Sequence, residues 1–142
     1  MAVQVRATYK LTGWNAPQLK LRVANIMTAY GKAMDQQLKE EIQLVQFPWP
    51  GVTYRRNGTI EGSPRDIVDT GAFLRSQRRE RLDATTLRFT WGNDGVNYAG
   101  YILRGVPGKN YPARDWIKPA LSNLPLDRFF KAEWARLANR GL

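Results

Sequence analysis

Hydrophobic residues recur along this chain with two different periods, and the changes of period mark the predicted elements. Residues 3–9 alternate apolar and polar side chains, which predicts a short strand with one buried face. Beyond a turn at Thr12-Gly13, apolar residues recur every three or four positions. This spacing predicts one amphipathic helix that starts at Asn15-Ala16-Pro17, with Asn15 as the cap, and runs to about Gln46, before Pro48. Its apolar stripe consists of Leu19, Val23, Ile26, Met27, Tyr30, Met34, Leu38, Ile42 and Val45.

This helix is long for so small a chain. With a rise of ~1.5 Å per residue it would measure about 48 Å, more than a compact domain of this size spans. We therefore expect part of the stripe to be buried against another subunit. Gly31 interrupts the stripe and marks either a bend or a close approach of another segment.

The remaining elements are shorter. Residues 47–68 carry three prolines and three glycines without a sustained period, which predicts a long irregular loop. A short turn or helix follows, with Phe73 at its apolar centre, and residues 77–82 and 86–92 form a predicted β-hairpin. Residues 96–103 fit a helix or a strand, and residues 113–121 and 127–139 are predicted helices. The pattern predicts a single α+β domain over residues 1–142, in which a small antiparallel sheet packs on one long N-terminal helix, with two shorter C-terminal helices.

Composition narrows the chemistry. The 142 residues contain no histidine and no cysteine, which removes the commonest general base, the thiolate nucleophile and the usual zinc ligands. We expect a non-enzymatic protein without a cofactor or a metal. No apolar run reaches the roughly 20 residues that cross a bilayer, and the first residues do not form a signal peptide, so we also expect a soluble intracellular protein.

The formal net charge is +10, and arginine supplies most of the surplus. Such a surplus suits polyanions and ion-paired protein interfaces alike. Arg55 and Arg56 lie in the long loop, where they can reach a polyanion without disturbing the core, and Trp49 between two prolines is expected to anchor that loop. The hairpin region carries a second cluster, for which a solvated strand face is the alternative: Arg75, Arg78, Arg79 and Arg81.

Asp69 supports one enzymatic alternative. Ile67-Val68-Asp69-Thr70-Gly71-Ala72 resembles the active-site signature of retroviral-type aspartic proteases, in which two such aspartates share a proton and activate water. Those proteases are almost entirely β, whereas this chain devotes more than 30 residues to one predicted helix. An aspartate before a turn is also an ordinary helix cap.

Several segments, taken in order, resemble the head-tail joining or tail-completion proteins of long-tailed bacteriophages. The resemblance rests on the order of a long helix, an irregular loop, a Thr-Gly element, a hairpin, a Tyr-Ala-x-Tyr segment and a Pro-x-Arg-x-aromatic-x-x-Pro-Ala-Leu helix start. The matching segments are residues 69–76, 96–101, Gly105 and 112–121. Their framework residues are Asp69, Gly71, Leu74, Tyr98, Ala99, Tyr101, Gly105, Arg114, Trp116 and Pro119.

The framework has a physical interpretation and two departures from the family pattern. Gly71 and Gly105 would permit tight turns, Tyr98 and Tyr101 would pack between hairpin and helix, and Trp116 and Leu121 would begin a helix that closes the core. Leu103-Arg104 stands where the family often has an acidic residue, and Asp115 follows Arg114 where a proline is usual.

The resemblance implies a structural virion protein. It would form a ring, expected to be a hexamer, at the head-tail junction, and would complete or terminate the tail tube and join it to the neck. Its partners would be copies of itself, neighbouring connector and tail-tube proteins, and weakly the double-stranded DNA that passes through. The alternative from another class is a free, non-specific nucleic-acid-binding module.

Overall fold

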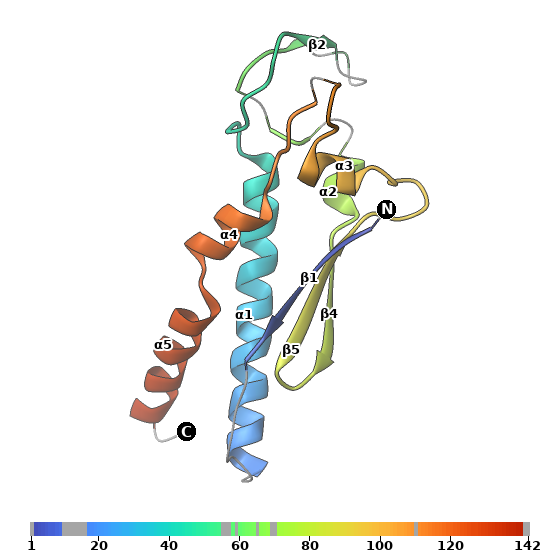
Figure 1. Cartoon of the computed structure of the whole chain (residues 1–142). Coiled ribbons are helices and arrows are strands. Elements are labelled where there is room, and N and C mark those ends of the chain that lie inside the picture. Colours follow the sequence, from blue (N-terminus) through green and yellow to red (C-terminus); the bar gives the residue numbers. More distant parts are fainter. Residues whose placement is uncertain are drawn as a thin grey trace.

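A computed structural model describes residues 2–9, 17–54, 58, 60–64, 66–68, 71–109 and 111–140 (Figure 1). The architecture is α+β, as predicted. The elements are β1 (Val3–Thr8), α1 (Pro17–Gln43), β2 (Thr53–Tyr54), β3 (Ile60–Glu61), α2 (Ala72–Arg75), β4 (Arg78–Asp83), β5 (Thr86–Trp91), α3 (Ala99–Arg104), α4 (Ile117–Asn123) and α5 (Leu126–Asn139). In Figure 1 the strands β1, β5 and β4 lie on one side of α1, and α4 and α5 lie on the other.

The main sheet is antiparallel with strand order β1-β5-β4. The predicted first strand and the predicted hairpin are both confirmed, and β1 pairs with the far strand of that hairpin. Val5 and Arg79 both lie opposite Phe89, and Phe89 is buried. The alternating pattern of β5 therefore places Leu87, Phe89 and Trp91 on the inner face, toward the helices.

Helix α1 ends at Gln43, three residues before the predicted end. Beyond it the chain turns, and Gln46 Nε2 donates a hydrogen bond of 3.1 Å to the carbonyl oxygen of Glu41. This side chain satisfies one of the carbonyl groups that a helix end leaves without a partner. The turn also carries Val45 out of the stripe, so the prediction that Val45 continues the buried face is wrong. The turn predicted at Thr12-Gly13 and the predicted cap Asn15 lie outside the described residues.

The apolar stripe of α1 is covered within the chain. Its residues from Val23 to Ile42 are at most 2% exposed, and α1 contacts α4, α5 and β5. The expectation that another subunit covers part of this stripe is therefore wrong for these residues. Gly31 marks a close approach, because a Cβ added there would lie 3.1 Å from Leu87 Cδ1 on the hairpin.

One carboxylate lies inside this helix packing. Glu41 is 2% exposed and accepts hydrogen bonds from three amide groups: Gln37 Nε2 at 3.1 Å, Gln46 Nε2 at 2.8 Å and Asn123 Nδ2 at 2.9 Å. Hydrogen bonds to its oxygens offset the cost of burying the group. Because Asn123 is the last residue of α4, the contact also fixes α4 on α1.

Aromatic rings fill the upper core. Trp116 packs edge-on against Trp91 at 5.2 Å and against Phe73 at 5.0 Å, measured between ring centroids. Lower down, Tyr9 stacks on Phe130 of α5 at 3.6 Å. Trp116 is fully buried, so its predicted role in closing the core is confirmed.

Two predictions for the C-terminal half need correction. Helix α4 begins at Ile117 rather than near Ala113, because the Asp115 carboxylate accepts hydrogen bonds from the amides of Ile117 (2.8 Å) and Lys118 (3.0 Å) and caps the helix there. Leu121 is exposed and does not close the core, and Tyr101 is exposed on α3 rather than packed between hairpin and helix, because each projects from the outer side of its helix. In the ambiguous segment 96–103, residues 99–103 belong to the helix α3, which ends at Arg104.

Candidate interaction surfaces

The arginines of β4 point to opposite faces of the sheet, as an alternating strand requires. Arg79 donates to the carbonyl oxygen of Gly31 at 3.0 Å and lies 3.9 Å from the Asp35 carboxylate. Arg81 donates to the carbonyl oxygen of Ala24 at 3.0 Å and also bonds the Thr28 hydroxyl. These two side chains therefore hold the hairpin on α1.

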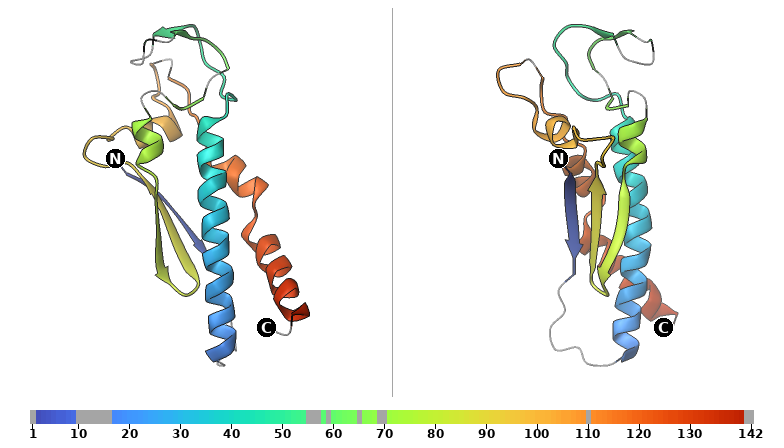
Figure 2. Two further views of the ribbon diagram at one scale, coloured as in Figure 1. Left: turned by 180° about the vertical axis from the view of Figure 1, so that it is seen from behind. Right: turned by 90° about the vertical axis from the view of Figure 1, so that its right-hand side faces the viewer.

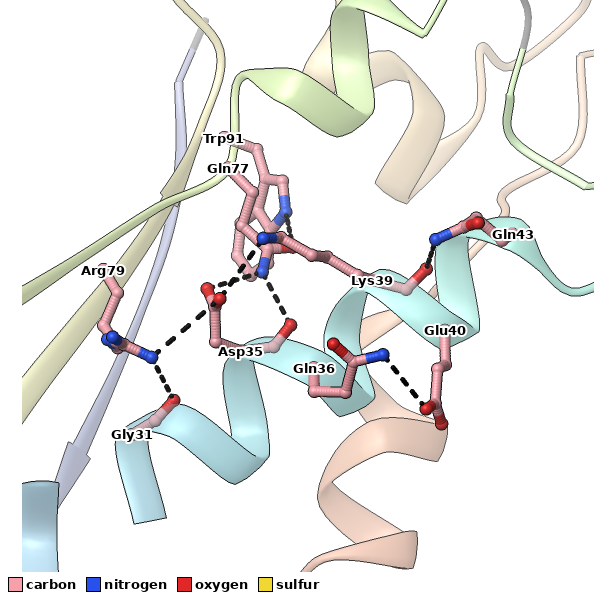
Figure 3. A network of polar contacts seen from close by, with 9 residues as sticks. All are labelled: Gly31, Asp35, Gln36, Lys39, Glu40, Gln43, Gln77, Arg79 and Trp91. Atoms are coloured by element: carbon pink, nitrogen blue, oxygen red, sulfur yellow. Dashed lines mark hydrogen bonds and ion pairs between the residues drawn. The ribbon is translucent and has the colours of Figure 1, made fainter. Parts of the chain in front are cut away.

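Asp35 is the centre of this contact (Figure 3). Its carboxylate lies 3.3 Å from Lys39 Nζ and accepts a hydrogen bond of 2.9 Å from Gln77 Nε2, which also donates to the Asp35 carbonyl oxygen. Gln77 in turn accepts a hydrogen bond of 2.9 Å from Trp91 Nε1. The network joins α1 to the start of β4 and the end of β5, so its role is to hold the hairpin on the helix.

The opposite face of the sheet is polar throughout, and we call it the open sheet face. It consists of Gln4, Arg6, Thr8, Arg78, Glu80, Asp83, Thr86, Arg88 and Thr90; Asp83 is included because it pairs with Thr86 beyond the bulge in β4. Arg88 forms an ion pair with Glu80 at 2.8 Å, and the Thr8 hydroxyl donates to the Thr86 hydroxyl at 3.2 Å. Both contacts run between neighbouring strands and confirm that these side chains share one face.

Other basic candidates are placed elsewhere. Arg75 is exposed at the end of α2, and its Nη1 lies 2.7 Å from the position that a Cβ on Gly71 would take. Arg55 and Arg56, together with Asp69 of the protease alternative, lie outside the described residues. The basic candidates that the structure describes are thus not gathered at a single site.

The described residues of segment 47–64 project beyond the end of α1 and contain the small sheet β2–β3; we call them the arm (Figure 1). Trp49 anchors its base, as expected. The Trp49 ring packs edge-on against Tyr111 at 5.0 Å, and the Arg114 guanidinium carbon lies 4.6 Å from the Trp49 ring centroid. Arg114 also donates a hydrogen bond of 2.7 Å to the Tyr111 hydroxyl. The buried Arg114 of the family framework thus supports the arm.

The outer part of the arm exposes apolar side chains. Val52 is 63%, Tyr54 79% and Ile60 62% exposed. Tyr54 lies directly opposite Ile60 in the β2–β3 ladder, and Val52 precedes Tyr54 by two residues; we call these three exposed residues the tip patch. A monomer gains nothing by exposing such a patch, which is typical of a contact surface.

The framework residues that the structure describes shape the chain rather than converge on a reacting centre. Gly71 has φ 86°, and Gly105 has φ 72° and ψ −177°, a region that other residues rarely adopt, so both predicted turns are confirmed. Tyr98 immediately precedes α3, and its ring centroid lies 6.5 Å from that of Phe73. Ala99 is buried, whereas Leu74 and Pro119 are half-buried.

Reasoning from the sequence missed several residues of these surfaces. The alternation around Arg6 and Arg88 is visible in the sequence, but only strand pairing shows that the two lie opposite one another. Val52, Tyr54 and Ile60 give no periodic signal, because each strand of the arm has only two residues. The capping role of Asp115 could have been predicted, because an aspartate just before an apolar helical segment is a common helix cap. In the family pattern this residue is only a departure.

Comparison of the chain with protein-family models, with curated proteins and with solved structures found no match. The phage-family resemblance therefore stays a prediction. Within the described part of the chain, no three side chains of histidine, cysteine, aspartate or glutamate gather as a metal site requires. None of the described helices combines the length and the apolar character that crossing a bilayer requires.

Proposed function

We propose that this chain is a structural protein of a tailed bacteriophage virion, which forms a ring at the head-tail junction, completes or terminates the tail tube and joins it to the neck. The position at the head-tail junction is taken from the resemblance of the ordered sequence motifs to the phage family. The structural observation that carries the assembly role is the arm, with its exposed tip patch and its fixed base.

The arm is poorly stabilised by its own contacts. An isolated two-stranded hairpin is marginal in water, and here each strand has two residues. Covering a valine, tyrosine or isoleucine side chain contributes roughly 1.5–3 kcal/mol each. A neighbouring copy that covers the tip patch would supply the layer that the arm lacks.

The base of the arm makes this contact directional. Trp49, Tyr111 and Arg114 hold the arm beyond the end of α1, and the Ile67 amide donates a hydrogen bond of 3.0 Å to the Ile42 carbonyl oxygen where the segment returns to the helix. An arm that contacts a different surface on the next copy produces a head-to-tail interface. Such an interface closes into a ring when the rotation between copies divides the circle.

The expected partners follow from that position. The ring would contact connector proteins on one side and tail-tube proteins on the other, and six copies would follow the symmetry of the tail, as the resemblance implies. Double-stranded DNA would pass through its centre. Weak, sequence-independent contact suits that passage, because tight binding would impede it.

The test is the oligomeric state of the purified chain and its dependence on the tip patch. Light scattering after size-exclusion chromatography, followed by negative-stain imaging, is expected to show a ring for the wild type. The double variant Val52→Ser/Tyr54→Ser should be monomeric with unchanged circular dichroism. The matched control is Leu21→Ser, which alters an equally exposed (63%) side chain on α1 and should leave the ring intact.

Two outcomes would contradict the proposal. A wild type that stays monomeric at all concentrations has no ring to form, and a ring that survives in the tip-patch variant is assembled by another surface. The second candidate function, a free nucleic-acid-binding module, is favoured by the surplus of arginine on the open sheet face. It requires a monomer that binds DNA tightly and in a strongly salt-dependent manner.

A further inference from the structure

We propose that the open sheet face is a binding site for the phosphate backbone of double-stranded DNA, without sequence preference. The biological setting, DNA passing through a ring, rests on the proposed function. The binding itself is a property of the single chain and is tested separately.

The face carries uncompensated positive charge. It contains three arginines and two carboxylates: Glu80 is already occupied by Arg88 at 2.8 Å, and Asp83, at the bulge end of β4, accepts hydrogen bonds from the amide and hydroxyl of Thr85. The side chains of Arg6 and Arg78 form no ion pair or hydrogen bond with any residue that the structure describes. Two guanidinium groups on this face are therefore available to an anion.

Strand pairing places like charges beside each other. Arg6 on β1 lies directly opposite Arg88 on β5. Arg78 on β4 lies opposite Thr90, which is the next residue of β5 after Arg88 on the same face. Directly opposed like charges on one sheet face destabilise it. A phosphate seated between Arg6 and Arg88 would remove that repulsion and accept hydrogen bonds from both, because guanidinium groups match phosphate geometry.

The chemistry of the face favours phosphate over an acidic protein. None of the nine side chains that strand pairing places on this face is apolar, and the exposed Leu82 lies in the bulge at its end. Protein interfaces depend instead on buried aromatic and apolar anchors at their centre. Arginine, threonine and glutamine are the side chains that contact phosphate and sugar oxygens in DNA complexes. In this chain apolar contact chemistry is found instead on the tip patch of the arm.

The face is also accessible to a large ligand. Gln4, Arg6, Thr8 and Arg78 are exposed, and no described helix lies in front of β1, β5 and β4 in the right-hand view of Figure 2. The helices α1, α4 and α5 stand on other sides, so DNA could approach the three strands broadside. With only two or three phosphate contacts per copy, binding should be weak and sensitive to salt.

The experiment measures the affinity of the full chain for a fluorescent DNA duplex by anisotropy over a range of salt concentrations. The double variant Arg6→Gln/Arg78→Gln removes two guanidinium groups from the face and keeps the Arg88–Glu80 pair. The matched control Arg128→Gln/Arg140→Gln removes the same charge from α5 and its C-cap, on exposed residues outside the face. We expect about tenfold weaker binding at low salt for the first, and a salt slope lower by about 2, with little change in the control.

The remaining outcomes separate this proposal from the proposed function. Equal losses in both double variants would mean that net charge alone attracts DNA, which overturns the site. No DNA binding by the wild type overturns it too, as does tighter binding of poly-glutamate than of DNA, which would assign the face to an acidic protein. If the chain is monomeric yet loses DNA binding only in the first variant, the ring is wrong and the phosphate site stands.

Discussion

The apolar stripe of α1 is covered by the chain itself, whereas the tip patch of the arm lies in solvent. Tyr30 of α1 is 0% exposed and Tyr54 of the arm is 79% exposed. Both residues belong to elements of regular structure, so secondary structure alone does not explain the difference. The number of layers does, because α1 lies between the sheet and the C-terminal helices while β2–β3 has no second layer in the described chain.

The two regions therefore have different roles. In the body, buried apolar contacts supply the stability of the fold. In the arm, the tip patch is exposed beyond a base of aromatic and guanidinium contacts, and we propose that a neighbouring copy covers it. Stability should depend on the body and association on the arm, and four substitutions test how sharply the two separate.

Trp116→Ala should have the largest effect. The substitution empties the space between Trp91 and Phe73, and removing a buried tryptophan costs about 3–5 kcal/mol. Urea unfolding monitored by circular dichroism measures the change. Tyr54→Ala on the arm is the control and should shift the unfolding free energy of the monomer by less than about 0.5 kcal/mol. Similar losses of unfolding free energy in both variants would show that the body and the arm do not differ in their contribution to stability.

Gly105→Ala should have the next largest effect and lower the free energy of unfolding by about 2–3 kcal/mol. Its backbone lies in a region that favours glycine, and a Cβ there would lie 2.6 Å from the Tyr111 carbonyl oxygen and 2.7 Å from the Ala113 nitrogen. Gly108→Ala is the matched control, because Gly108 also has a positive φ (+78°) but no atom lies within 4 Å of an added Cβ. This control should lower the free energy of unfolding by only about 1 kcal/mol. Thermal unfolding of the two variants isolates the contact, and a smaller loss at Gly105 than at Gly108 would contradict the close approach.

Trp49→Ala is expected to cost about 1–2 kcal/mol, because it removes the ring that contacts Tyr111 and Arg114. Hydrogen exchange should accelerate at the described amides of residues 47–64 and stay unchanged in the centre of α1. Equal acceleration in α1 would show that the arm and the body unfold as one unit.

Tyr30→Phe should cost about 1 kcal/mol near pH 7, because the phenol donates a hydrogen bond of 2.9 Å to the Leu124 carbonyl oxygen. Burial raises the pKa of Tyr30 to about 12. An unfolded tyrosine ionises near pH ~10, so the stabilising contribution is complete below that pH and is lost as pH rises through about 12.

The advantage of wild type over Tyr30→Phe should therefore shrink through this pH range, as measured by denaturant unfolding. The exposed Tyr101→Phe serves as the control, with no such trend. A constant difference between wild type and Tyr30→Phe would show that Tyr30 is not buried as a neutral phenol.

Much of this architecture follows from the sequence alone. The periods of three to four and of two determine the long helix, the first strand, the hairpin and the α+β class, because burying one face of each element requires that spacing. The absence of histidine and cysteine limits the available chemistry through composition alone. The turns at Gly71 and Gly105 and the anchoring role of Trp49 are also predictable, since turn geometry and proline-flanked aromatics are local features.

Tertiary structure decided which side chains meet. The stripe of α1 gives no sign that α4, α5 and β5 of the same chain cover it, and the end of the helix depends on Gln46 returning to Glu41. Strand pairing alone sets Arg6 beside Arg88 and turns Arg79 and Arg81 onto α1. The physical reason is that period determines which face of an element is apolar, whereas partner, register and exposure depend on contacts between segments far apart in the chain.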